Sequence, residues 1–119
     1  MPSKDPVEPR AVVRRSKRVP LSVPVLISGH ARNNKKFDES TATLMVNANG
    51  GLVLLATRVD VGETVVVRNR LTQEEEQCRI VYVGPQQAQG KARVGVAFQR
   101  PAKHFWKIDF PPLGTEGGA

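Results

Sequence analysis

A run of basic residues near the N-terminus is the part of this 119-residue chain best suited to chemistry. It reads Arg14-Arg15-Ser16-Lys17-Arg18 and stands immediately before the first segment with a strand pattern. A guanidinium group is a planar fork that grips a phosphate, or the O6/N7 edge of a guanine, through two hydrogen bonds at once. Several such forks on an arm beside a rigid domain predict a clamp for an anionic, guanine-bearing ligand. The competing interpretation is a solvated basic tail.

The distribution of charge favours a localised site. Residues 1–36 hold nine Lys and Arg residues against two acidic ones, whereas the remainder of the chain holds nine of each. The formal net charge of +7 therefore belongs to the first third of the sequence. A neutral body with a basic arm indicates one anionic partner rather than general binding of polyanions.

Other site chemistry finds little support in the sequence. His30 and His104 have no Cys, Asp or second His at metal-ligand spacing, and there is no nucleophile–base pair or carboxylate dyad. We therefore predict a protein that is not an enzyme, with no metal and no cofactor. The single cysteine, Cys78, cannot form an internal disulfide, which fits a reducing compartment. No apolar run approaches the roughly 20 residues that cross a bilayer, and residues 1–20 lack a signal-peptide core, so we expect a cytoplasmic location without membrane insertion.

Short strands are the elements that must position the basic arm. Apolar residues alternate from Val19 to Ile27, which predicts one buried face of a strand, and Pro20 and Pro24 predict that this strand is at an edge or bent. Residues 29–39 have the composition of a polar loop. Five further strands are predicted over Ser40–Val46, Leu52–Ala56, Thr64–Arg68, Gln77–Val83 and Ala92–Phe98.

Two details of this pattern bear on the site and the core. Asn47-Ala48-Asn49-Gly50-Gly51 predicts a sharp hairpin turn, because Asn and Gly tolerate the positive φ that tight turns use. Cys78 shares its expected strand face with Ile80 and Tyr82, so we expect its side chain to fill the core.

The fold class that follows is all-β, a small antiparallel barrel or sandwich of six strands. Residues 1–13, with Pro2, Pro6 and Pro9, are expected to be a disordered lead-in. The ordered domain is expected over 14–110 and a flexible tail over 111–119. After Pro101 we expect one helical turn or an extended piece whose aromatic residues, Phe105 and Trp106 among them, pack on the barrel.

The order of these features resembles the PilZ domain family. The similarity comprises an Arg-x-x-x-Arg arm (Arg14 and Arg18), a following hydrophobic strand and a hairpin that ends in Gly50-Gly51. It extends through the turn at 61–63 and the strands at 78–84 and 94–98, and it covers about residues 14–110. PilZ domains are split six-stranded barrels that bind the bacterial second messenger cyclic di-GMP. The resemblance therefore implies a cyclic di-GMP receptor domain that signals when its arm becomes ordered and alters contact with a protein effector.

The second motif of the family is altered in this chain. Aligned on Gly51, the family's Asp or Asn and its Ser fall on Val46 and Ala48, whose side chains cannot hydrogen-bond a guanine. Each lost contact is worth about 1–3 kcal/mol where a polar edge is left unpaired. The neighbouring Asn47 and Asn49 are either replacements for these contacts or simply turn formers. The ligand-binding residues that we predict are Arg14, Arg15, Arg18, Asn47, Asn49, Gly50 and Gly51.

Two other functions compete with the cyclic di-GMP sensor. A PilZ-like module with an impaired second motif is also expected to work as a protein-interaction adaptor without the nucleotide. A barrel that binds single-stranded nucleic acid would stack bases on exposed aromatic residues, but the few aromatic residues here are mostly core candidates. Nucleic acid is therefore the less favoured partner.

Overall fold

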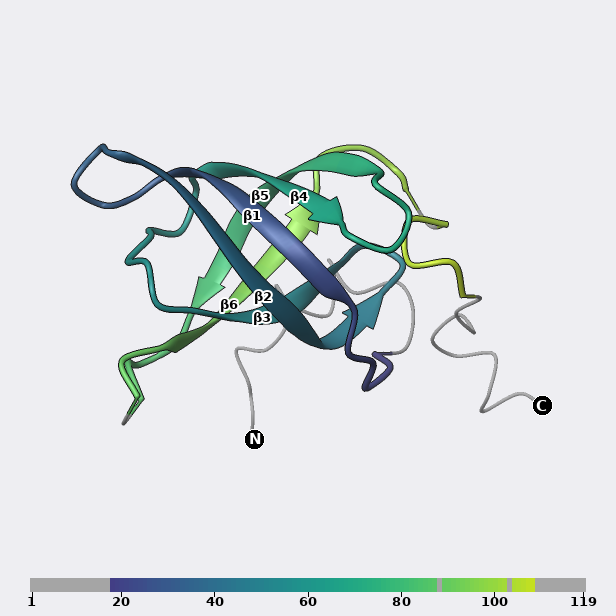
Figure 1. The fold of residues 1–119 in the computed structure, drawn as a ribbon, viewed down its shortest axis with the longest axis horizontal. Coiled ribbons are helices and arrows are strands. Elements are labelled where there is room, and N and C mark those ends of the chain that lie inside the picture. Colours follow the sequence, from purple (N-terminus) through teal and green to yellow (C-terminus); the bar gives the residue numbers. More distant parts are fainter. Residues whose placement is uncertain (1–17, 88, 103, 109–119) are drawn as a thin grey trace, which may run out of the picture.

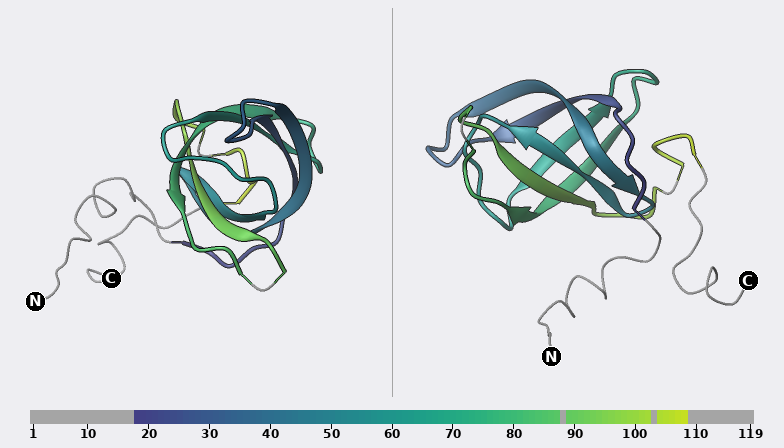
Figure 2. Two further views of the ribbon diagram at one scale, coloured as in Figure 1. Left: turned by 90° about the vertical axis from the view of Figure 1, so that its left-hand side faces the viewer. Right: turned by 90° about the horizontal axis from the view of Figure 1, so that it is seen from below.

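The chain forms a closed antiparallel barrel of six strands, as the sequence predicts (Figures 1 and 2). The computed structural model describes residues 18–87, 89–102 and 104–108. The predicted lead-in and C-terminal tail both lie outside these residues. Around the barrel the strands follow the order β1-β2-β3-β6-β5-β4. Their bounds are β1 Pro24–His30, β2 Lys36–Asn47, β3 Gly50–Leu55, β4 Thr64–Asn69, β5 Glu75–Val83 and β6 Ala92–Phe98.

Alternating β-branched residues fill the barrel. In β4, for example, Val65 and Val67 are 1% exposed, whereas Val66 between them lies on the outer side and is only partly buried. The same period of two brings aliphatic side chains from all six strands inward. The fully buried interior includes Val25, Ile27, Val46, Val53, Leu55, Val65, Val67, Cys78, Ile80 and Val94.

The first strand is bent rather than an edge strand. β1 begins at Pro24 and pairs with both β2 and β4, so neither of its sides is an open edge. Before Pro24 the chain continues along β2, where the backbones of Val19 and Val46 exchange two hydrogen bonds of 2.8 and 2.9 Å. Pro20 and Pro24 thus lie where the chain leaves regular strand pairing. Because a proline has no amide hydrogen to donate, it is suited to a bend at such a position.

The prediction of a polar loop over residues 29–39 is wrong. β1 extends to His30 and β2 starts at Lys36, which leaves a connection of only five residues, and the hairpin projects beyond the rest of the barrel (Figure 1). Most side chains of this outer part are polar and exposed. Because the projecting hairpin has little core to cover, it lacks the apolar alternation by which a strand is recognised.

The segment after Pro101 is a tight turn that packs on the barrel. The amides of Phe105 and Lys107 donate to carbonyl oxygens three residues earlier, at 2.9 and 3.0 Å, and no helix is found in the described part of the chain. Phe105 and Trp106 are each 3% exposed, and their rings meet edge to face at 4.9 Å. The predicted packing of these two aromatic residues is confirmed.

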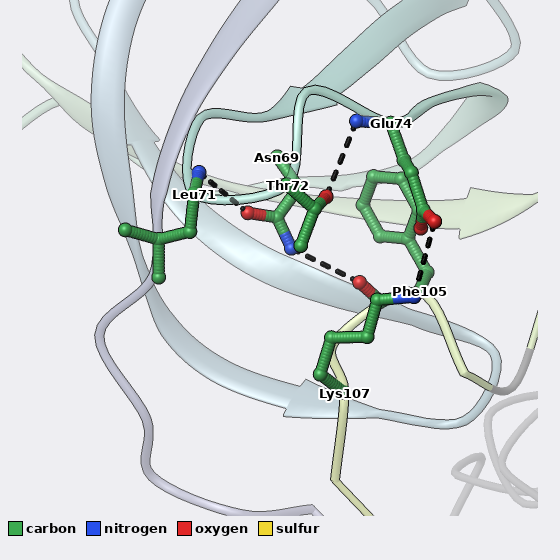
Figure 3. A network of polar contacts seen from close by, with 6 residues as sticks. All are labelled: Asn69, Leu71, Thr72, Glu74, Phe105 and Lys107. Carbon is green, nitrogen blue, oxygen red and sulfur yellow. Dashed lines mark hydrogen bonds and ion pairs between the residues drawn. The ribbon is translucent and has the colours of Figure 1, made fainter.

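A buried asparagine ties this C-terminal turn to the β4–β5 turn (Figure 3). Asn69 is 1% exposed. Its Nδ2 donates to the carbonyl oxygen of Phe105 at 3.0 Å, and its Oδ1 accepts from the amide of Leu71 at 2.9 Å. An ion pair of 3.0 Å between Lys107 and Glu74 adds a second link at the surface. Since a buried amide must satisfy its polar atoms, Asn69 fixes both turns together.

The buried thiol of Cys78 gives a prediction about alkaline pH. Burial, and to a smaller extent the nearby Glu76 carboxylate, together raise the pKa of Cys78 from an ordinary 9.0 to about 12. The unfolded thiol ionises above about pH 9 while the folded thiol stays protonated, so proton release favours the unfolded chain. We expect the contribution of this thiol to stability to be complete below pH 9 and to fall between pH 9 and 12. Alkylation by iodoacetamide at pH 8.5 should be slow in buffer and fast in urea; equal rates would contradict the assignment.

Candidate ligand-binding site

A groove of about 580 Å³ crosses the outside of four adjacent strands near the start of β3. This volume is typical of small-molecule sites in proteins. The walls come from the end of β2, the start of β3, the end of β5 and the middle of β6, with Arg18 contributed by the segment before β1. The residues that line the groove are Arg18, Met45, Val46, Asn47, Asn49, Gly50, Gly51, Leu52, Val81, Tyr82, Arg93, Gly95, Val96 and Ala97.

Backbone pairing brings Arg18 to the groove. The paired backbones of Val19 and Val46 dock the chain directly after Arg18 against the end of β2. Thr43 secures the same segment: its Oγ1 accepts from the amide of Val23 at 2.8 Å and donates to the carbonyl oxygen of Leu21 at 2.5 Å. Arg18 therefore lies beside the β2–β3 hairpin and is one of the residues that line the groove. Arg14 and Arg15 lie outside the described residues.

The polar side chains of the hairpin have a structural role as well as a place in the groove. Oδ1 of Asn47 accepts a hydrogen bond of 2.8 Å from the amide of Asn49, which closes the turn. Both asparagines line the groove. Val46, one of the two hairpin positions at which a polar residue was sought in the sequence, is 1% exposed and belongs to the core. Its side chain completes the barrel interior instead of presenting a polar group to the groove.

Gly50 and Gly51 are the first residues of β3 rather than part of the turn. The turn does not use positive φ at its central positions, since Asn34, Gln73 and Lys107 are the non-glycine residues with positive φ in the described chain. Positive φ occurs instead at Gly50 (+158°), where a Cβ would also lie 2.0 Å from the carbonyl oxygen of Val96. The sharp hairpin turn that was predicted for these residues is confirmed, with Ala48 and Asn49 at its centre.

Trp106 contacts the start of β3, which forms one wall of the groove. Its indole Nε1 donates to the carbonyl oxygen of Gly50 at 3.0 Å, and the bond is buried. A Cβ on Gly51 would lie 3.2 Å from Cζ2 of the same indole. The C-terminal turn thus holds the start of β3, and with it one wall of the groove, in place.

Two residues of the groove were missed by sequence reasoning. Tyr82 was expected on the same inward strand face as Cys78 and Ile80, but the pairing of β5 with β6 shifts between Ile80 and Tyr82, and Tyr82 is 44% exposed. The bulge that causes this shift has no signal in the apolar pattern. Arg93 could have been found, because it precedes buried Val94 on β6 and alternation places it outside.

Charge in the groove favours an anion. Among the described residues that line it are two arginines, Arg18 and Arg93, and no Asp or Glu. A smaller cavity of about 160 Å³ lies at the opposite end of β3 and also contains arginines. There Arg32 pairs with Asp60 at 2.9 Å and Arg58 donates to Gln86 at 2.8 Å. The larger groove is the better candidate for a ligand of nucleotide size because its volume is greater.

No group of three or more His, Cys, Asp or Glu side chains is arranged to hold a metal ion in the described part of the chain. Within the same residues, none of the elements is a helix with the length and apolar character that crossing a membrane requires.

Comparisons with known proteins add a similarity to a solved structure. No protein-family model and no curated protein matches the sequence. The chain is similar to the crystal structure of a PilZ domain of CeSA from a cellulose-synthesizing bacterium, with 18% sequence identity and a TM-score of 0.47. The match covers 71% of this chain and 84% of that chain.

Proposed function

We propose that this barrel binds cyclic di-GMP in the groove beside the β2–β3 hairpin. The observation that carries the proposal is the meeting of Arg18, Asn47 and Asn49 with Gly50 and Gly51 in one groove lined by no acidic residue of the described chain. These residues were selected from the sequence because their order resembles the PilZ motifs. Residues separated by nearly thirty positions thus contribute to one surface.

The chemistry of the groove suits a cyclic dinucleotide. Such a ligand carries two phosphate charges and two purine bases, so it offers both anionic groups and planar edges to a guanidinium fork. In this proposal Arg18, which precedes β1, and Arg93, on β6, supply these forks to the ligand. Arg14 and Arg15 precede Arg18 in the sequence, and in this proposal the arm closes over the bound ligand. Ordering a segment consumes part of the binding free energy but changes the surface that a partner meets.

In this proposal the chain is a signalling module rather than an enzyme. It is located in the cytoplasm. Binding of the nucleotide changes the position of the arm and thereby alters contact with a protein effector. The binding residues are Arg14, Arg15, Arg18, Asn47, Asn49, Gly50 and Gly51, with Arg93 as an addition from the groove geometry.

Isothermal titration calorimetry with the full chain tests the proposal. We expect saturable heat with a micromolar or lower dissociation constant for cyclic di-GMP, and a weaker response to GMP, which has one base and one phosphate. The dissociation constant should rise with salt, because arginine–phosphate contacts are screened by ions. Absence of heat at millimolar cyclic di-GMP would reject the proposal and leave the adaptor function as the alternative.

A further inference from the structure

The bulge in β5 places two consecutive apolar residues on the groove. Ile80 pairs with Val96 and Tyr82 pairs with Gly95, so Val81 is the extra residue on β5. In a regular strand one of two neighbours would face the core. Here Val81 and Tyr82 are 45% and 44% exposed. The irregularity therefore has one clear consequence, an aromatic ring presented on the surface beside the hairpin.

Neighbouring glycines define the position of this ring. A Cβ on Gly84 would lie 3.0 Å from the hydroxyl oxygen of Tyr82 and 3.3 Å from Cε2 of its ring. A Cβ on Gly95, across the strand pair, would lie 3.2 Å from Cβ of Tyr82. The space beside each of these two glycines is so small that a larger residue there would displace the tyrosine. These close neighbours therefore restrict the position of the ring more than that of an isolated surface side chain.

The surroundings indicate what such a ring could contact. Tyr82 shares the groove with Leu52 and Val81, which are apolar, and with Arg18 and Arg93, which are cationic. An exposed ring among aliphatic and cationic groups suits a ligand that is both planar and anionic. A nucleotide combines these properties, and a base stacked on an aromatic side chain contributes about 1–3 kcal/mol in nucleic-acid complexes.

We propose that Tyr82 stacks on one purine of the bound cyclic dinucleotide and is thereby a binding residue of the groove. This inference rests on the proposed function. Stacking uses the face of a base rather than its edge, so it is independent of hydrogen bonds to the guanine. Tyr82 therefore supplies affinity from β5 where Val46 and Ala48 of the hairpin cannot supply it.

Calorimetry on three variants tests the role of the ring. Tyr82→Ala should weaken cyclic di-GMP binding by about 5- to 150-fold, the range that corresponds to the loss of one stacked base. Tyr82→Phe keeps the ring and should bind within about twofold of the natural chain. Leu71→Ala removes a side chain that is 72% exposed in the β4–β5 turn, outside the groove, and should leave binding unchanged.

A measurement on the unmodified chain covers the case in which Tyr82→Ala does not fold. Tyr82 is the only tyrosine in the sequence, so its ring resonances can be identified without ambiguity. Stacking should shift these ring protons upfield in proportion to the bound fraction. If cyclic di-GMP binds but neither the ring resonances nor the affinity of Tyr82→Ala responds, the role of Tyr82 is overturned and the proposed function stands. If the natural chain does not bind at all, both are overturned.

Discussion

Replacing Gly50 by alanine is expected to lower the free energy of unfolding by about 3 kcal/mol or more. The added Cβ would lie 2.0 Å from the carbonyl oxygen of Val96, which is part of the backbone of β6 and cannot rotate away. Relief requires β3 and β6 to separate, which weakens their ladder and strains the bond from the indole of Trp106 to the Gly50 carbonyl. Urea unfolding followed by Trp106 fluorescence measures the loss.

Gly62→Ala is the matched control for this variant. Gly62 has a φ of +98°, and nothing lies within 4 Å of the place where its Cβ would stand. Alanine there should cost only the backbone strain of positive φ, about 1–2 kcal/mol. If Gly50→Ala is no more destabilised than Gly62→Ala, the close approach of β3 to β6 is not the reason for glycine at position 50.

Replacing Arg18 by alanine is expected to weaken cyclic di-GMP binding by about 10- to 150-fold. Hydrogen bonds to charged groups are worth about 1.5–3 kcal/mol, which corresponds to that range. Arg18 is the part of the arm that the structure places on the groove. Arg18→Lys keeps the positive charge but loses the planar fork, so its affinity should fall between those of the alanine variant and the natural chain.

Arg100→Ala tests whether binding depends on where a positive charge lies or only on the net charge of the chain. Arg100 pairs with Glu76 at 3.1 Å, is not among the residues that line the groove, and its removal changes the net charge by the same unit. This variant should bind cyclic di-GMP like the natural chain at 0.15 M salt, where charges farther apart than about 8 Å are screened. Equal losses in Arg18→Ala and Arg100→Ala would show that only general electrostatic attraction is at work.

The barrel could be predicted from the sequence because its interior follows simple alternation. Strands that bury one face, such as Thr64–Asn69 and Ala92–Phe98, were found close to their observed bounds. The first four residues of β2, 36–39, were missed because Lys36 and Asp38 are polar and exposed, and only pairing with β1 makes this segment a strand. Such pairing depends on a partner elsewhere in the chain, which local patterns do not report.

The site could be predicted only in part. Motif order selected Arg18 and the hairpin, and the fold gathers them in one groove. The tyrosine was misassigned because a one-residue bulge reverses the facing of every later position on its strand, and no local residue pattern announces a bulge. The inward direction of Val46 likewise follows from the register of β2 with β3 and not from its own residue type.

The most direct test of the account is a titration of the ¹⁵N-labelled full chain with cyclic di-GMP, followed by amide chemical shifts. We expect saturable changes at groove residues, above all Arg18, Asn49 and Tyr82. Amides around the smaller cavity, such as those of Arg58 and Gln86, should remain unchanged. If an excess of the nucleotide leaves the groove amides where they were, or moves those of the opposite cavity instead, this groove is not a cyclic di-GMP site.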